Sequence, residues 1–254
     1  MRTGSLEPAE MEGDQMQRWL FAGVSDKREL ILYICRLLAA AGHRVLLIDG
    51  TAGRKYQYLA RNSTGDLPLI EFCGFDISAG LPEVVGEAET FKGQPEAEQH
   101  SGYDYVLYDF EPELPVRAWL WPQIDRFIWV TTFDHYEVER SAAWFRQLLQ
   151  ADPELGEISI EPVLVRTVES YLTADYMMSI VEDLPIHWEA EVTCIPWNEI
   201  DAAVHFENGH EHTLAIHKVT RSYKRALVSL LVQLAGWTRG EAKRALRSAQ
   251  RRDL

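Results

Sequence analysis

Short apolar runs alternate with stretches of helical periodicity along most of the chain. The first run, residues 18–24 (RWLFAGV), predicts a buried parallel strand that leads into a loop at Gly23. Apolar residues then recur at helical spacing from Leu30 to Ala41, and a second apolar run, RVLLID, ends at Asp49. A crossover of this length between two apolar strands is typical of a βαβ unit with a parallel strand pair.

The same alternation continues after residue 102. Further strands are predicted at 103–110 (YDYVLYDF), 125–132 (DRFIWVTT), 158–166 (ISIEPVLVR) and 191–196 (EVTCIP), and helices at about 138–149, at 174–182, as a short helix from Glu199, and at about 218–234. Residues 54–102 favour loop or short helix around an acidic, Gly-rich connection. The alternation predicts an α/β fold with a doubly wound, mostly parallel sheet and helices on both faces.

The length and the apolar content indicate one large domain. The chain has 254 residues, 46% of them apolar, so it can bury a sizeable core. We expect a flexible acidic segment at 1–17, an α/β domain at 18–236, and a basic helix or tail at 237–254. Arg36 interrupts the longest apolar run, and the N-terminus has no apolar segment typical of a secretory signal. We therefore expect a cytoplasmic protein.

The net charge of -14 is unevenly distributed. From Lys218 onward there are ten basic and two acidic residues, which leaves 15 basic and 37 acidic residues before it. The acidic body argues against nonspecific binding to polyanions, and no specific nucleic acid is predicted. The basic tail could make peripheral contact with a membrane, touch nucleic acid or an acidic partner, or fold back on the acidic body.

The loop after the first strand carries candidate ligand-binding residues. A phosphate-binding loop curls backbone N–H groups around the phosphates, places a lysine against their charge, and uses a Ser or Thr hydroxyl to complete a Mg²⁺ shell. Gly23, Ser25 and Lys27 fit the loop, but Arg28 stands where the hydroxyl is needed. Asp26 adds a carboxylate where phosphate would lie. The loop thus keeps its scaffold and loses much of its chemistry.

Several segments in order resemble the MinD/ParA family of deviant Walker P-loop ATPases, in the SIMIBI class, from about residue 18 to 236. Lys27 precedes Asp49 by 22 residues, similar to the family spacing between the loop lysine and the strand ending in LID. The segment GYDYVLYD places Asp109 where the Walker B carboxylate lies. Three other matching segments are GLPEVVGEA at 80–88, DRFIWVTT, and TCIPWNEIDAAVHFENG at 193–209.

The resemblance implies an atypical or vestigial nucleotide site formed by Gly23, Ser25, Lys27, Arg28, Asp49 and Asp109. The family's signature lysine falls on Ala22, its Mg²⁺ hydroxyl on Arg28, and a switch aspartate on Thr51. The adenine-reading asparagine would lie near Arg166 and Thr167. ATP or ADP remains a candidate ligand, whereas these exchanges argue against Mg²⁺ binding and efficient hydrolysis. The alternative for Lys27 is a surface lysine paired with Asp26 or Asp49.

Two function hypotheses follow from the resemblance. The first is a homodimeric scaffold, near the TadZ/CpaE branch, that recruits or localises cytoplasmic machinery such as a pilus or secretion assembly. The second is an active ATPase with an atypical P-loop that cycles between monomer and dimer on membrane or DNA. A tyrosine-kinase-like relative ranks last, because no tyrosine follows Tyr223.

Other clusters offer weaker candidates. Arg117, Trp119 and Trp121 fall at the family's second switch, where they either pack against the core or form a partner-contact site. The histidine-rich segment HFENGHEHTLAIH follows no zinc spacing, and its Asn-Gly pair (208–209) indicates a solvated turn. Three widely spaced cysteines, at 35, 73 and 194, are expected to be buried free thiols.

Overall fold

The computed structural model describes residues 16–59, 69–78, 102–112, 123–189 and 191–251. Within these residues a nine-stranded sheet has the order β3-β4-β2-β5-β1-β6-β7-β8, with β9 also paired to β7. All neighbours are parallel except the β3–β4 hairpin. The strands are β1 (Gln17–Ala22), β2 (Val45–Gly50), β3 (Leu69–Phe72), β4 (Phe75–Ser78), β5 (Tyr105–Phe110), β6 (Arg126–Thr131), β7 (Ser159–Thr167), β8 (His187–Trp188) and β9 (Thr193–Pro196).

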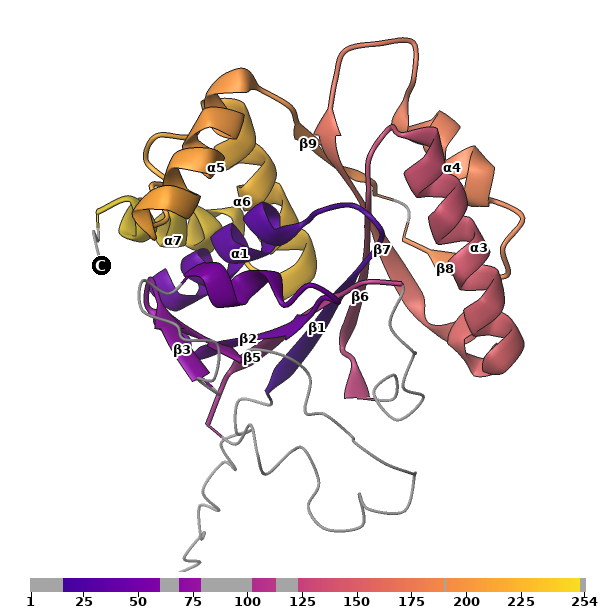
Figure 1. Cartoon of the computed structure of the whole chain (residues 1–254), viewed down its shortest axis with the longest axis horizontal. Helices are drawn as coiled ribbons and strands as arrows, with labels where there is room; N and C mark the ends of the chain where they lie inside the picture. The colour runs from indigo at the N-terminus through magenta and orange to yellow at the C-terminus, as the bar shows by residue number, and fades with distance from the viewer. Residues whose placement is uncertain (1–15, 60–68, 79–101, 113–122, 190, 252–254) are drawn as a thin grey trace, which may run out of the picture.

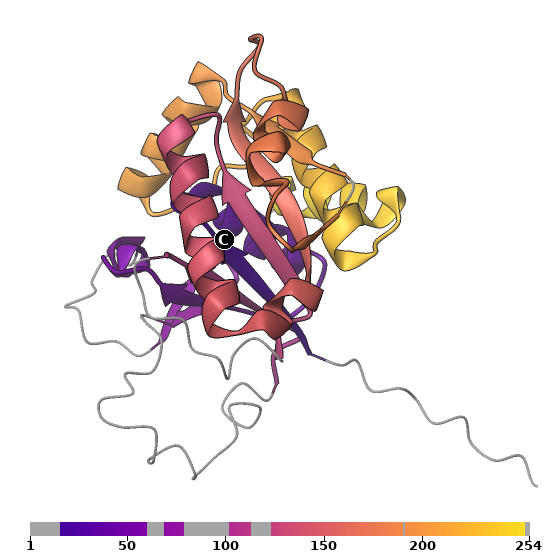
Figure 2. The same cartoon turned by 90° about the vertical axis from the view of Figure 1, so that its right-hand side faces the viewer.

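Helices cover both faces of the sheet, as the sequence pattern predicts (Figure 1). On one side lie α1 (Arg28–Ala40), α5 (Glu199–Glu211), α6 (Arg221–Ala235) and α7 (Arg239–Arg251), and on the other α3 (His135–Ala151) and α4 (Ala174–Val181). The 3₁₀ helices η1 (Lys55–Leu59) and η3 (Pro153–Glu157) connect strands and helices. Figure 2 views the face that α3 and α4 cover. The predicted doubly wound α/β architecture is confirmed.

Side chains along β1 point alternately to the two faces of the sheet, which explains why helices pack on both faces. Trp19 and Phe21 belong to the core beneath α1, α6 and α7, whereas Leu20 and Ala22 belong to the core beneath α3 and α4. All four side chains are fully buried. A strand that is apolar at every position can bury both faces only in the middle of a helix-covered sheet.

The β3–β4 hairpin is the main departure from the predicted elements, because the sequence pattern favours loop or short helix over 54–102. Its strands have only four residues each, and Phe72 pairs with Phe75 around a two-residue turn. The turn residues Cys73 and Gly74 have φ of 49° and 86°. Two positive φ values suit a hairpin turn, but a Cys-Gly pair between such short strands is a weak sequence signal.

The end of α5 also differs from the prediction. We expected a turn at residues 208–209, yet α5 continues to Glu211 and ends at His212, whose φ of 54° is left-handed. The Asn208 side chain is buried, donates to the Tyr33 hydroxyl, and accepts from the backbone of Ala215. These hydrogen bonds stabilise the helix at Asn208, although an asparagine followed by glycine usually indicates a turn.

The C-terminal helix α7 packs against α1 and α6. Its alanines at 242, 245 and 249 are buried. Arg36 of α1, which interrupts an apolar run in the sequence, lies beneath it and donates to the carbonyl oxygens of Cys73 and Ala249. The tail therefore folds back onto the body of the protein.

Two further findings concern expectations from composition. None of the helices in the described ranges is long and apolar enough to cross a membrane. The three cysteines are free, but only Cys35 is buried, whereas Cys194 is exposed. The expectation of buried thiols is therefore wrong for Cys194, which lies on a strand whose side chains alternate between buried and exposed.

Candidate functional site

The loop between β1 and α1 lies at the carboxyl ends of the central strands. In the sheet register Asp49 pairs with Asp109, and Phe21 at the end of β1 also pairs with Asp109. Gly23 has φ of +150°, and a Cβ there would lie 2.0 Å from the carbonyl oxygen of Val130. Only glycine lets the backbone pass this close to β6. Parallel topology thus brings the predicted residues to one edge.

Lys27 forms a buried ion pair with Asp109. Its Nζ lies 2.8 Å from Asp109 Oδ1, and the two side chains are 1% and 2% exposed. Nζ also donates to the carbonyl oxygen of Gly23 at 3.0 Å. The alternative prediction of a surface lysine paired with Asp26 or Asp49 is therefore wrong. A buried ammonium group needs a nearby anion, and Asp109 is the one that the sheet register supplies.

The second oxygen of Asp109 is bound by Tyr56, a residue that the sequence pattern missed. The Tyr56 hydroxyl donates to Asp109 Oδ2 at 2.7 Å, and its backbone N–H donates to Asp49 Oδ2 at 3.0 Å. Burial and the charge of Asp109 raise the pKa of Tyr56 well above its usual value, so the phenol stays a donor. Tyr56 sits on the short η1, in a region without helical or strand periodicity.

Both carboxylate oxygens of Asp49 also accept hydrogen bonds from within the chain. Its Oδ1 accepts from the backbone N–H of Thr51 at 3.0 Å and from the Thr51 hydroxyl at 2.6 Å. Burial raises the pKa of Asp49, although these hydrogen bonds oppose it. Each carboxylate oxygen of Asp49 and Asp109 therefore has a partner, which leaves little reason for either to bind a cation here.

Asp26 places an anion at the N-terminus of α1. Its carboxylate accepts from the backbone N–H of Arg28 at 3.2 Å and from the guanidinium, with Nη2 to Oδ2 at 2.7 Å. Burial works to raise the pKa of Asp26, but the hydrogen bonds and charge of Arg28 outweigh it and hold that pKa well below its usual range. This carboxylate occupies the position that favours an external anion.

Ser25 is committed to a neighbouring helix. Its hydroxyl donates to Glu137 Oε2 at 2.5 Å, and Thr132 donates to the same oxygen. Glu137 lies in the first turn of α3, three residues after the N-cap Asp134, which is the usual position of a capping-box glutamate. Sequence patterns therefore gave no reason to group it with the loop.

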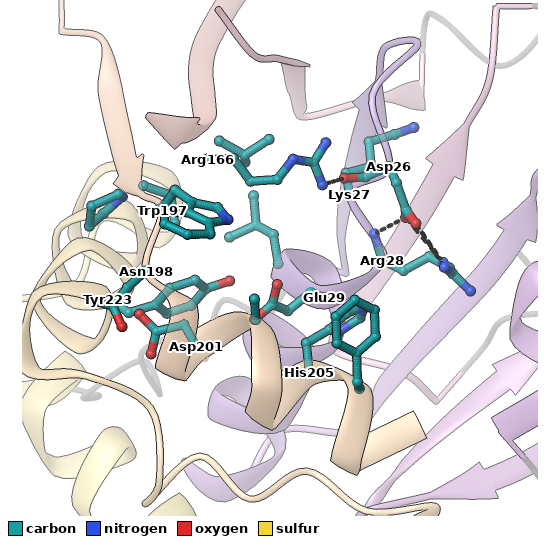
Figure 3. Close-up of a pocket in the computed structure, with 16 residues that line it drawn as sticks. Asp26, Lys27, Arg28, Glu29, Arg166, Trp197, Asn198, Asp201, His205 and Tyr223 are labelled. Atoms are coloured by element: carbon teal, nitrogen blue, oxygen red, sulfur yellow. Dashed lines mark hydrogen bonds and ion pairs between the residues drawn. The ribbon is translucent and has the colours of Figure 1, made fainter. Parts of the chain in front are cut away.

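A cavity of about 280 Å³ opens beside the loop, between α1, α5 and the ends of β7 and β9 (Figure 3). Its walls include Glu29, Arg166, Trp197 and Tyr223. Arg166, in a left-handed backbone conformation with φ of 53°, donates from Nη1 to the carbonyl oxygen of Asp26 at 3.0 Å. The cavity is thus lined both by the loop and the start of α1 and by later parts of the chain.

Some predicted residues lie outside the described ranges. Arg117, Trp119 and Trp121 do so, and so does the segment 80–88. Within the ranges that are described, no cluster of three or more His, Cys, Asp or Glu side chains could hold a metal ion.

Comparison with known proteins shows which solved structures share this fold. No family model and no curated protein matches the chain. Among solved structures, a chain of the Aquifex aeolicus MinC:MinD cell division protein complex has a TM-score of 0.64 at 15% identity, with 87% of this chain and 97% of that one covered. MinD from Aquifex aeolicus scores 0.62 at 17% identity, with 87% and 98% covered.

A putative plasmid partition protein from Borrelia burgdorferi, bound to AMPPNP, scores 0.54 at 16% identity, with 92% of this chain and 98% of that one covered. These likenesses confirm the resemblance at the level of fold: the chain has the P-loop NTPase fold of MinD and ParA proteins. At such identities the likeness concerns the fold alone.

Proposed function

We propose that this protein is a scaffold of the MinD/ParA fold whose nucleotide site has been replaced by internal contacts. Lys27 is paired with Asp109 in the core, and Asp26 lies at the helix N-terminus. An incoming phosphate would have to break a buried ion pair and displace a carboxylate that Arg28 holds. The observation on which the proposal rests is that the charges of the loop are paired within the chain, Lys27 with Asp109 and Asp26 with Arg28.

The scaffold would localise or recruit components of a cytoplasmic assembly, such as pilus or secretion machinery. We propose that two copies associate across the loop face without nucleotide, because Asp26 already supplies the negative charge that a bound phosphate would bring. Support comes from the fold, whose relatives include a protein solved in a cell division complex with MinC.

A pair of substitutions that restores the missing groups tests this proposal. Asp26→Gly removes the competing anion, and Arg28→Thr supplies a hydroxyl for Mg²⁺. We expect calorimetry to show no saturable Mg²⁺-ATP binding by the unmodified chain at concentrations up to about 1 mM, which corresponds to about 4 kcal/mol. The double variant should bind more tightly than this limit. Sedimentation of both should show whether ATP changes the fraction of dimer.

The alternative is an active ATPase with an atypical loop, and the same samples distinguish it. Saturable micromolar binding of Mg²⁺-ATP by the unmodified chain, abolished by Lys27→Ala in a variant that circular dichroism shows to be folded, would contradict the scaffold. ATP-driven dimerisation of the unmodified chain, or phosphate release that Lys27→Ala removes, would contradict it equally. Asp152→Asn, a change at the end of α3, serves as the matched control.

A further inference from the structure

A groove runs along the N-terminal half of α1, between that helix and α5. It consists of the 280 Å³ cavity and a second cavity of about 250 Å³, which share Arg28, Glu29, His205 and Phe206 in their linings. The first cavity is shown in Figure 3. Two adjoining cavities of this size offer room for several side chains of an extended or helical segment.

A carboxylate oxygen without a partner lies in this groove. Glu29 Oε1 is buried and has no hydrogen-bond partner among the residues that the structure describes. The neighbouring Asp201 differs, since both of its oxygens accept hydrogen bonds from Thr220. Arg166 also lines the cavity, but its guanidinium is directed to the carbonyl of Asp26 (Figure 3). Glu29 thus keeps one acceptor for a ligand, because buried polar atoms normally have partners.

Exposed aromatic side chains border the same groove. Trp197 is 51% exposed and Phe206 is 68% exposed, and both line the first cavity. Aromatic faces attract cations, and exposed tryptophan is enriched where proteins bind one another.

We propose that this groove binds a segment of a partner protein and that an arginine or lysine of that segment enters the first cavity, between Trp197 and the Glu29 carboxylate. The inference deepens the proposed scaffold function and rests on it, because the cavity must be free of nucleotide. Aromatic walls and an unpaired carboxylate oxygen together match a guanidinium or ammonium group, which has N–H donors and a positive charge.

The net charge of the chain favours a basic segment. The lining of the first cavity is itself balanced, with three basic and three acidic side chains, so a cation would be attracted there mainly by the Glu29 oxygen that has no partner. Burial, reinforced by the charge of Asp201, raises the pKa of Glu29 to about 7, whereas the charge of Arg166 and a hydrogen bond from Tyr223 to the carboxylate oppose this rise. A cation against Oε1 replaces the solvation that the carboxylate has lost. The sequence before Lys218 holds 37 acidic and 15 basic residues. Such a body attracts basic segments and repels nucleic acid.

Selection of 12-residue peptides displayed on phage tests the proposal, with the full-length chain as target and the Glu29→Gln chain for counter-selection. We expect the selected peptides to share one Arg or Lys. Replacing that residue with citrulline or norleucine should weaken binding by about tenfold or more, as should Glu29→Gln. Trp197→Ala, at a half-exposed position, should weaken binding by roughly three- to tenfold. Glu139→Gln, on the opposite face, is the matched control.

Other outcomes overturn the inference. A selection that yields no peptide preferring the unmodified chain over Glu29→Gln contradicts it, and so do selected peptides without a shared cation. Adenosine that competes with the peptides, and whose binding falls in Glu29→Gln, would show that the cavity is a nucleobase site. Binding of adenosine would contradict the inference about the groove, but it would not contradict the proposed scaffold unless Mg²⁺-ATP also binds through Lys27. Failure of the inference and failure of the proposed function can therefore be distinguished.

Discussion

At the scale of single residues, the Glu29 carboxylate has one buried oxygen without a hydrogen-bond partner among the described residues. Its pKa is raised from 4.5 to about 7, first by burial and then by the charge of Asp201. The folded state therefore favours the protonated form. This contribution to stability is complete below pH 4.5, and it is lost as the pH rises through about 7.

Glu29→Gln should make this pH dependence visible, because glutamine is neutral at every pH. We expect the variant to gain stability over the unmodified chain as the pH rises from about 4.5 to about 7, by up to ~3 kcal/mol at about 1.4 kcal/mol for each pKa unit. Urea unfolding at pH 5 and pH 8 measures the change, with Glu139→Gln as the control. An equal difference between the two chains at both pH values would contradict it.

The residues of the loop show how far sequence reasoning reaches at this scale. The sequence singles out Lys27 as the lysine of a phosphate-binding loop, and the resemblance to MinD/ParA proteins implies Asp49 and Asp109. Each stands at the end of an apolar strand or just before a helix, and parallel strands bring such ends together. Tyr56 and Glu137 are not singled out, because one lies on a short 3₁₀ helix and the other resembles a helix cap. Partners that come from weakly patterned segments become visible only in three dimensions.

At the scale of elements, periodicity located the long helices and the central strands, and it failed where elements are short or held by single side chains. The β3–β4 hairpin has four-residue strands, too short for alternation to be distinguished from chance. The end of α5 depends on Asn208, whose side-chain bonds reach Tyr33 and Ala215. Tertiary contacts override local preference at both places.

Arg36 connects three elements, and of their association the sequence suggested only the folding back of the C-terminal helix. From within α1 it donates at 2.9 Å to the carbonyl of Cys73 in the hairpin turn, and at 3.4 Å to the carbonyl of Ala249 in α7. Arg36→Met keeps the apolar stem and removes these donors. We expect the free energy of unfolding to fall by about 2 kcal/mol, since bonds to charged groups contribute more than neutral ones.

Hydrogen exchange followed by mass spectrometry shows where Arg36→Met acts. Exchange should accelerate in α7 and in the β3–β4 hairpin before it does in β1 or β5, because those two elements lose a tie to α1. Arg225→Met, at an exposed position on α6, is the matched control and should leave exchange unchanged. Uniform acceleration throughout the chain would mean that Arg36 supports the core as a whole and has no specific role in docking α7.

At the scale of the whole molecule, the charge of the chain is separated between an acidic body and the basic helix α7. Because the alanine face of α7 is buried against α1 and α6, its outward face presents exposed cations. These are Arg239, Lys243, Arg244, Arg247 and Arg251. A docked helix of this kind can attract an anionic membrane surface electrostatically, but it has no free apolar face to insert.

Vesicle binding should therefore depend strongly on salt. With vesicles rich in phosphatidylserine, we expect co-sedimentation at about 50 mM salt and its loss near 0.5 M, because the screening length shrinks severalfold over this range. Arg244→Glu combined with Arg247→Glu should abolish binding, whereas Arg140→Glu on α3 should not. Exchange of the α7 amides should stay slow on the vesicles. Binding that survives high salt while α7 amides exchange rapidly would show instead that the helix leaves α1 and inserts, because only release of its buried alanine face could supply a salt-independent attraction.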